Sequence, residues 1–408
     1  KLEETQIPKW LTKIQNNSWE PEIIISGFSI AFFFILPKYI YNFTAMLIQD
    51  FGADALLSFV QYTIMIFIIT SLKVLFIGHL TLRGLWTGLV GLSYVFPNGV
   101  KKELLEKELK NLTFKKPIAL VIEIEKICSL IFSFAFMIIL YLIKIMMFYF
   151  VLIAGNIIFY AFNLNSAAMQ FAQLTLIAIV IVIFVIFQTF KKKMFWEHTS
   201  NSVSSNLIHT FSTNISKKRM RLILLSFIII TIPLSYSSIS KFKFDVQRKL
   251  RISKSNLTYV DQNNYLNEKN NGLRIPRAAI NSFLIENSLL ELYISSYKRD
   301  EGLIRDIQAN FDKYKIVMPK VPGVPEVDIN KLDQTGLYQI FVDDELILVK
   351  DWLLKKGVDN SQKFLTAEIP VDNISSGIHT LKINRVRWRK KDKDFVIIKD
   401  WASIPFKM

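Results

Sequence analysis

Long apolar runs fill most of the first 240 residues of the chain, and short polar or basic stretches separate them. A helix needs about 20 apolar residues to cross the hydrocarbon core of a bilayer. The runs therefore predict about five transmembrane helices, which form an α-helical multi-pass membrane domain of residues 22–240. Their expected positions are residues 23–48, 55–77, 127–160, 168–190 and 222–239.

The third run is longer than one crossing needs and too poor in turn residues for two crossings. We expect one long helix here, which begins at the membrane surface near Glu123 and Glu125. Two crossings would move the basic cluster at 191–193 to the side opposite the other basic clusters, and this argues against a sixth helix.

Residues 78–99 follow the second run directly but differ from it in composition. Glycines stand at positions 78, 84, 88 and 91, His79 and Arg83 lie among them, and Pro97-Asn98-Gly99 ends the segment. A re-entrant or interfacial segment is tolerated where its backbone groups find partners in protein or water. We expect this segment to lie along, or dip into, the cytosolic side of the membrane rather than to form an extra crossing.

Two amphipathic stretches are expected at the membrane surface. Residues 1–21 place Trp10 on the apolar face of a short interfacial segment, at the level of the lipid head groups. Residues 101–110 predict an amphipathic helix, in which Glu103 and Lys107 form an ion pair one turn apart.

Beyond residue 240 the composition is that of a water-soluble α+β region. A strand is expected at 289–295 and a hairpin at 338–349, where an acidic turn joins two apolar runs. Further strands are expected at 364–371, 378–386 and 395–399. Short strands at this spacing suggest a small β-sandwich over residues 327–408, preceded by a mixed α/β connector over residues 241–326.

The formal net charge of +16 does not indicate nucleic acid, because the basic clusters match topology signals and lack aromatic residues interleaved on a sheet. Basic residues in short loops mark the cytosolic side of a membrane protein and bind anionic lipid head groups. With five crossings, the clusters at 101–116, 191–193 and 217–221 are all cytosolic. The expected location is the inner cell membrane, with the N-terminus in the cytoplasm and the C-terminal domain periplasmic or extracellular.

Four ionisable residues in apolar surroundings are candidates for binding lipid or an anion, or for lining a pore: His79, Arg83, Lys38 and Lys144. His79 and Arg83 are four residues apart and share one helical face, where they suit a lipid phosphate or a substrate anion. The plainer reading places both at the head-group boundary. For Lys38 and Lys144, a cavity or counter-ion competes with snorkelling of the long side chain to the interface.

Two further groups of residues are candidates for interactions. Gly84, Gly88 and Gly91 have the small-residue spacing that lets membrane helices pack closely, within the protein or between subunits. Arg385, Arg387 and Arg389 alternate along a predicted strand and therefore share one face, which suits an anionic surface or acidic partner. The plainer reading is a charged edge that prevents aggregation.

The sequence carries no catalytic motif. The four histidines are scattered, no phosphate-binding glycine loop or nucleophile elbow is present, and the single cysteine excludes a cysteine-rich metal site. No cofactor is expected. The favoured hypothesis is a membrane scaffold or interaction subunit that presents a β-rich domain outside the inner membrane, within a complex or homo-oligomer. The alternatives are a channel or transporter for an anionic or lipid-like solute and, third, a membrane enzyme acting on a lipid-linked substrate.

Overall fold

The computed structural model describes residues 19–161 (except 105, 107 and 109–111), 175, 203–244, 260–267, 272–286, 288–318, 328–357, 361–389 and 394–408. Contacts divide the chain into two compact units. The helical unit comprises Lys1–Pro37, Thr63–Leu152 and Ala178–Ile239. The β unit comprises Lys38–Tyr62, Ile153–Ile177 and Ser240–Met408, so it includes the turn between the first two helices.

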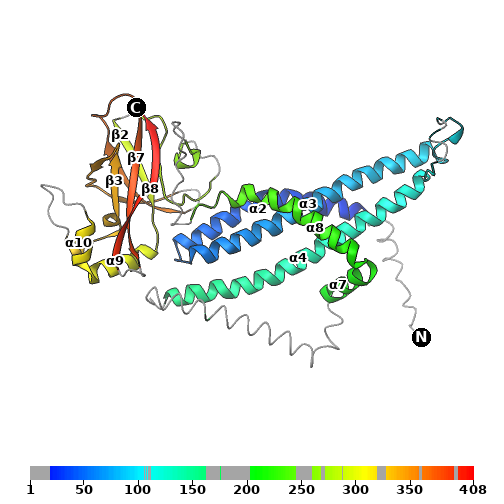
Figure 1. The fold of residues 1–408 in the computed structure, drawn as a ribbon, viewed down its shortest axis with the longest axis horizontal. Helices are drawn as coiled ribbons and strands as arrows, with labels where there is room; N and C mark the ends of the chain where they lie inside the picture. The colour runs from blue at the N-terminus through cyan, green and yellow to red at the C-terminus, as the bar shows by residue number, and fades with distance from the viewer. Residues whose placement is uncertain are drawn as a thin grey trace. The chain divides into compact units, whose positions relative to one another are not determined.

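Five helices are described before residue 240 (Figure 1): α2 (Trp19–Gln49), α3 (Ala55–Val95), α4 (Pro117–Ala161), α7 (Val203–Asn214) and α8 (Lys217–Ile239). At 1.5 Å per residue, α3 and α4 are each about 60–67 Å long, roughly twice the hydrocarbon thickness of a bilayer. Both α2 and α3 are long and apolar enough to cross a membrane. Pro37 lies inside α2 and Pro233 inside α8.

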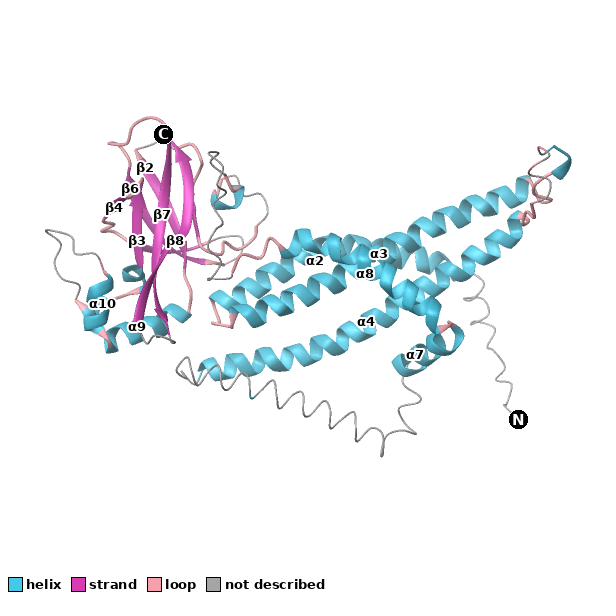
Figure 2. Cartoon of the chain, in the orientation of Figure 1, coloured by secondary structure: helices cyan, strands magenta, loops and turns pink. Residues whose placement is uncertain are grey.

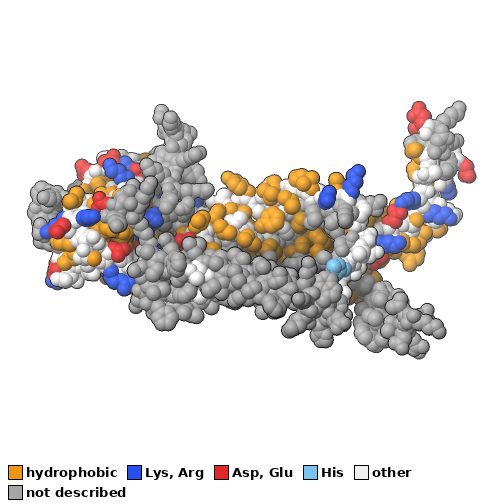
Figure 3. Space-filling view, turned by 60° about the horizontal axis from the view of Figure 1, so that its bottom comes forward, with side chains coloured by type: hydrophobic (Ala, Val, Ile, Leu, Met, Phe, Trp, Pro, Cys, Tyr) orange, Lys and Arg blue, Asp and Glu red, His pale blue; other side chains and the backbone are white. Residues whose placement is uncertain are grey.

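Apolar side chains cover the exposed flank of these helices. Phe28, Phe32 and Phe34 of α2 are each more than half exposed. Figure 3 shows hydrophobic atoms spread over the middle of the described helical surface, with charged atoms toward one end of it and on the β unit. Exposed aromatic and aliphatic residues in this density are typical of a surface that contacts a membrane or another protein.

The structure corrects the expectation for residues 78–99. These residues form neither a re-entrant nor a separate interfacial segment, because α3 continues without a break to Val95. Each glycine lowers helix stability by only about 1 kcal/mol relative to alanine. Four isolated glycines therefore do not end a helix whose other residues, before and after each glycine, favour helical hydrogen bonding. A helix also has no need to stop where the bilayer ends.

The amphipathic helix expected at 101–110 is also wrong for the described residues. A short 3₁₀ turn, Lys102–Leu104, is present, and Glu106 and Glu108 lie outside any helix. Helical ion pairs contribute only about 0.2–0.5 kcal/mol each, and isolated helices shorter than about 12 residues are marginal in water. The interfacial segment expected at 1–21 lies outside the described residues up to position 18, as does the crossing expected at 168–190 apart from Thr175.

Two antiparallel sheets of four strands form the C-terminal region (Figure 2). One sheet has the order β1-β2-β6-β5 and the other β4-β3-β7-β8. The strands are β1 (Ala278–Ile280), β2 (Leu289–Ser295), β3 (Tyr338–Val342), β4 (Glu345–Ile347), β5 (Leu353–Lys356), β6 (Lys363–Pro370), β7 (Ile378–Arg389) and β8 (Asp394–Lys407). Helices α9 (Arg299–Ala309) and α10 (Phe311–Val317) separate β2 from β3.

The sheets draw strands from both sides of the boundary expected at residue 326. Strand β2 lies in the segment expected as a connector, yet it pairs along its whole length with β6. Leu292 and Ile294 of β2 are fully buried, as are Ile383 of β7 and Phe406 of β8, and such residues form the core of the two sheets. The β-rich region therefore begins with β1, not after the connector.

Asp343 and Asp344 form the two-residue turn between β3 and β4. Both have positive φ, 45° and 73°, as a type I′ hairpin turn requires. Asp343 accepts a bond from the Thr380 amide (2.8 Å), and its other carboxylate oxygen lies 2.5 Å from His379 Nδ1. The hydrogen bond to Asp343 raises the pKa of His379, and the same bond holds the pKa of Asp343 below its usual range.

This turn predicts a pH-dependent contribution to stability. The folded state binds the His379 proton more tightly than the unfolded chain, so the contribution is complete below the unfolded pKa of about 6.5 and is lost as pH rises through the raised folded pKa. It is also lost at low pH, as Asp343 becomes protonated. Histidine NMR on the full chain should therefore give His379 a pKa above 6.5 that Asp343→Asn returns to the ordinary value. An unchanged titration in Asp343→Asn would contradict the assignment.

Candidate functional site

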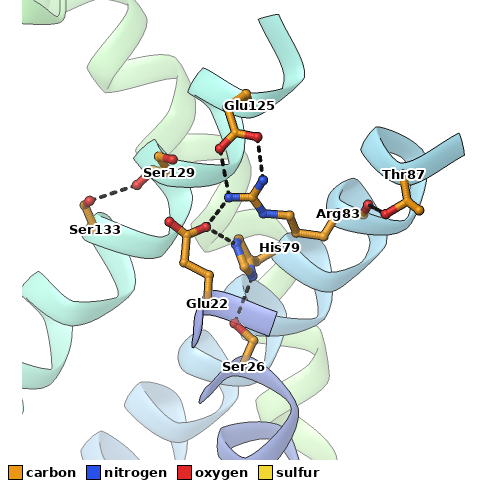
Figure 4. Close-up of polar contacts among 8 residues, drawn as sticks. All are labelled: Glu22, Ser26, His79, Arg83, Thr87, Glu125, Ser129 and Ser133. Carbon is orange, nitrogen blue, oxygen red and sulfur yellow. Dashed lines mark hydrogen bonds and ion pairs between the residues drawn. The ribbon is translucent and has the colours of Figure 1, made fainter. Parts of the chain in front are cut away.

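A cluster of charged residues joins three helices of the helical unit (Figure 4). Arg83 of α3 donates through Nη1 to Glu125 of α4 (2.6 Å) and through Nη2 to Glu22 of α2 and to the second Glu125 oxygen (3.2 Å). The Arg83 side chain is 1% exposed, against 10% for Glu22 and 34% for Glu125. We call Glu22, Ser26, His79, Arg83 and Glu125 the helix cluster.

His79 extends the cluster one turn along α3. Its Nε2 lies 3.3 Å from Glu22, and its Nδ1 lies 2.8 Å from the Ser26 hydroxyl. A neutral imidazole satisfies both ring nitrogens if Nε2 donates a hydrogen bond to Glu22 and Nδ1 accepts one from the Ser26 hydroxyl. The ring is fully buried and lies 5.2 Å from that of Phe132.

The local helical geometry explains this assembly. His79 and Arg83 are one turn apart and share a face of α3, Glu22 lies in the first turn of α2, and Glu125 lies in the third turn of α4. With His79 neutral, two carboxylates face one guanidinium, which leaves one net negative charge. Breaking a buried ion pair leaves an uncompensated charge, so removing one member of the cluster should disturb the packing of the three helices.

The helix cluster lies far along α3 from the turn that precedes it. Between Ala55 and His79 the helix rises by about 36 Å, which exceeds the hydrocarbon thickness of a bilayer. If α3 crosses a membrane from Ala55, the cluster lies at the far head-group boundary. This position suits the plainer of the two readings for His79 and Arg83.

Two donors beside the helix cluster have no acceptor in the described structure: Arg83 Nε and the indole nitrogen of Trp86, both of which are buried. The guanidinium carbon of Arg83 lies 5.3 Å from the centre of the Trp86 ring, whose other neighbour is Trp19 at 6.0 Å. The terminal nitrogens of Arg83 are taken by carboxylates of the chain itself. An anionic head group or substrate would have to displace Glu22 or Glu125 to bind them.

A second polar network lies in the β unit, where the turn after α2 meets the segment before β1. Arg274 donates to the Gln49 side chain (3.2 Å) and to Asp50 (2.9 Å). Gln49 in turn donates to the Ile275 carbonyl at 2.8 Å. Asn42 bonds both to the Gly272 carbonyl (2.8 Å) and to the Arg274 amide (2.9 Å). We call these contacts the joint.

The joint satisfies backbone groups that the end of a helix leaves open. The last carbonyls of a helix have no partner within it. The Gln49 carbonyl, at the end of α2, accepts a bond from the Lys298 amide (2.8 Å), and the Gly52 carbonyl accepts one from Arg299 Nε (2.8 Å). Gly52 has φ +67°, as expected of a residue just beyond a helix C-terminus. Lys298 and Arg299 therefore supply donors to the carbonyls at and just beyond the end of α2.

A buried ion pair lies just beyond the joint, between α9 and β7. Arg385 donates to Asp300, whose other oxygen accepts a bond from Tyr338 (3.3 Å). The guanidinium carbon lies 5.1–5.7 Å from the ring centres of Trp401, Tyr297 and Tyr338. Burial raises the pKa of the Asp300 carboxyl, against the opposing effect of Arg385, and raises the pKa of Tyr297 to about 12.

The remaining candidates from the sequence fall in separate places. Arg385 is inside the β unit and so is not part of a basic surface; Arg387 is half-buried, and the side chain of Arg389 lies outside the described residues. Lys38 is in the β unit, where its Nζ would lie 3.0 Å from a Cβ placed on Gly272. The side chain of Lys144 lies outside the described residues.

The three glycines proposed for helix packing have open surroundings. A Cβ placed on Gly84, Gly88 or Gly91 meets no atom within 4 Å among the described residues. The helices α2 and α4 contact α3 through Arg83 and Trp86, but no described residue lies against the glycines themselves. If the glycines serve in packing, the partner lies outside the described residues or in another molecule.

Sequence reasoning singled out His79 and Arg83 in the helix cluster and Arg385 in the buried ion pair, but no residue of the joint. Glu22, Gln49, Asp50, Arg274 and Asp300 were not singled out. The polar turn at 49–54 was the available signal for the joint, because it combines two acidic residues with glycine between two apolar runs. Among the described residues, no group of His, Cys, Asp and Glu has a metal-binding arrangement. No protein-family model, curated protein or solved structure matches this chain.

The helix cluster predicts a specific pattern of stability changes. Arg83→Met leaves the buried Glu22 carboxylate and the one-third exposed Glu125 carboxylate without their cation, which should destabilise the packing of α2, α3 and α4 by about 3 kcal/mol, the low end for a buried pair. Adding Glu22→Gln and Glu125→Gln removes the uncompensated charge and should restore most of the stability. Thermal unfolding of the detergent-solubilised chain measures both effects.

Glu20→Gln is the matched control, because Glu20 is an exposed acid in the same turn of α2 as Glu22. It should unfold at the wild-type temperature. If Arg83→Met behaves like this control, the cluster does not hold the helices together.

Proposed function

We propose that the chain is an integral membrane scaffold, which holds its β-rich domain in a fixed position at the outer surface of the inner membrane. The joint is the observation that carries the proposal. A domain on a free linker needs no bonds to the helix that anchors it, whereas here a buried arginine, two side-chain amides and several backbone groups join the end of α2 to the segment before β1. A fixed position is what a scaffold needs in order to present a surface.

The joint also supports an odd number of crossings. The turn between α2 and α3 follows the first crossing, and the β-rich domain follows the last. Because the two are in contact, both must lie on one side of the membrane. Five crossings satisfy this condition, by α2, α3, α4, residues 168–190 and α8. They also place the basic residues 101–116 on the opposite side, as the distribution of positive charge favours.

Side-specific cysteine labelling tests this topology. In a Cys128→Ala background, single cysteines at Leu56, Ser361 and Lys101 report on the turn, the β-rich domain and the basic loop. All three native residues are exposed. A membrane-impermeant maleimide added to intact cells should modify positions 56 and 361, and should reach position 101 only after the inner membrane is opened. Modification of positions 56 and 361 from opposite sides would overturn the proposal.

The scaffold proposal includes a partner, either another protein or a second copy of the chain. Its mass after purification in mild detergent should exceed that of one 47.4 kDa chain with its detergent. A strictly monodisperse monomer without a copurifying protein would count against a scaffold.

A channel or transporter is the second candidate, and the helix cluster is the observation that favours it. Ionisable residues buried between membrane helices often mark ion or proton pathways. The net negative charge of the cluster favours a cation or proton over the anion that His79 and Arg83 alone would suggest. Reconstituted liposomes should then show a proton or cation flux that Glu22→Gln reduces severalfold. The same leak in wild type, Glu22→Gln and Glu20→Gln would rule this out.

A further inference from the structure

Strand β5 is an edge strand with an unusual surface. It ends the order β1-β2-β6-β5 and pairs only with β6 among the described strands. All four of its residues are exposed, and Leu353 and Leu354 have exposed fractions of 72% and 67%. Because consecutive side chains in a strand point to opposite faces, the leucines project on both sides of the edge. Exposed apolar edges favour aggregation unless something covers them.

Basic residues surround the two leucines. The segment reads Lys350-Asp351-Trp352-Leu353-Leu354-Lys355-Lys356, and Lys363 is the cross-strand neighbour of Lys356. Lys350, Lys356 and Lys363 are exposed, while Lys355 lies against Tyr293, with its Nζ 3.3 Å from the phenolic oxygen. Tryptophan and leucine flanked by lysine is the composition of segments that bind the interface of an anionic bilayer.

The joint places this edge near the end of α2. The side-chain amides of Gln49, the last residue of α2, and of Gln362 donate to the same carbonyl, that of Ile275 (2.8 and 2.7 Å). Residue 363 follows directly and pairs with Lys356. The basic end of β5 is therefore a few residues away from the point where α2 ends. If α2 crosses the membrane, as the proposed function holds, this is the level of the lipid head groups.

We propose that residues 350–356 form a lipid-binding edge. Leu353 and Leu354 enter the boundary between head groups and acyl chains, and the lysines contact the phosphates of anionic lipids. Edge-on insertion covers the leucines on both faces of the strand, which a flat protein surface would not do. The inference rests on the proposed membrane anchoring and adds a second attachment of the β-rich domain to the bilayer.

An environment-sensitive fluorophore on single cysteines tests the inference in the full chain. Positions 353 and 354 are compared with position 378, in vesicles of phosphatidylcholine with or without phosphatidylglycerol. Ile378 is the matched control, because it is apolar and 60% exposed and lies about 23 Å along β7 from Arg385, which is near the joint. Emission at 353 and 354 should shift to the blue in anionic vesicles, with no shift at 378. Lys356→Gln should lower the inserted fraction about fivefold.

Two results would overturn the inference. One is emission at 353 and 354 that matches position 378 in anionic vesicles. The other is a blue shift in detergent alone that grows with protein concentration, which would assign the edge to a second copy of the chain. Failure of the proposed function is separate, because it shows as labelling of positions 56 and 361 from opposite sides. If those two positions share a side and position 353 stays water-exposed, only the lipid-binding edge is wrong.

Discussion

The end of α2 needs hydrogen-bond partners for its last carbonyls, and the arrangement of the β unit around this helix end depends on that need. A helix that ends near an interface leaves its last carbonyls open, and in apolar surroundings each unpaired group costs several kcal/mol. Here Lys298 and Arg299 supply donors to the turn, and Gln49 reaches the backbone before β1. The same few residues therefore end the helix, start the first sheet and position α9. A change at the joint should affect all three.

The β-rich domain was easier to predict from the sequence than the helical half. Strand β2 begins and ends where it was expected, and the hairpin of β3 and β4 turns at the acidic pair Asp343-Asp344. The alternation of apolar and polar residues and the turn residues mark the positions of these strands within short stretches of sequence. Strand β1, with three residues, and β5, with every residue exposed, leave no such pattern. Their membership in the sheet depends on pairing with distant strands, which is why the domain boundary was placed too late.

For the helical half, prediction from the sequence was limited in a different way. Apolar runs located α2 and α8 well, and one helix covers the overlong run at α4. The error at 78–95 came from treating the thickness of a bilayer as the length of a helix. The internal partners of the charged residues were missed for another reason. Arg83 and Arg385 were noticed as charges, but Glu22 and Asp300, which neutralise them, are 61 and 85 residues away in sequence. A single sequence holds no periodicity that links residues so far apart, so the expectations for both arginines, an external anion or a solvated boundary, left out the internal carboxylates.

Pulsed electron paramagnetic resonance on the full chain in a bilayer tests the central claim most directly. Spin labels at Leu56 and Ser361 report the distance across the joint, and both native residues are exposed. A fixed joint predicts one narrow distance distribution, which Arg274→Ala broadens because Gln49 and Asp50 lose their shared partner. A broad distribution in the wild-type chain, unchanged by Arg274→Ala, would show that the β-rich domain moves freely on its tether and would contradict the account.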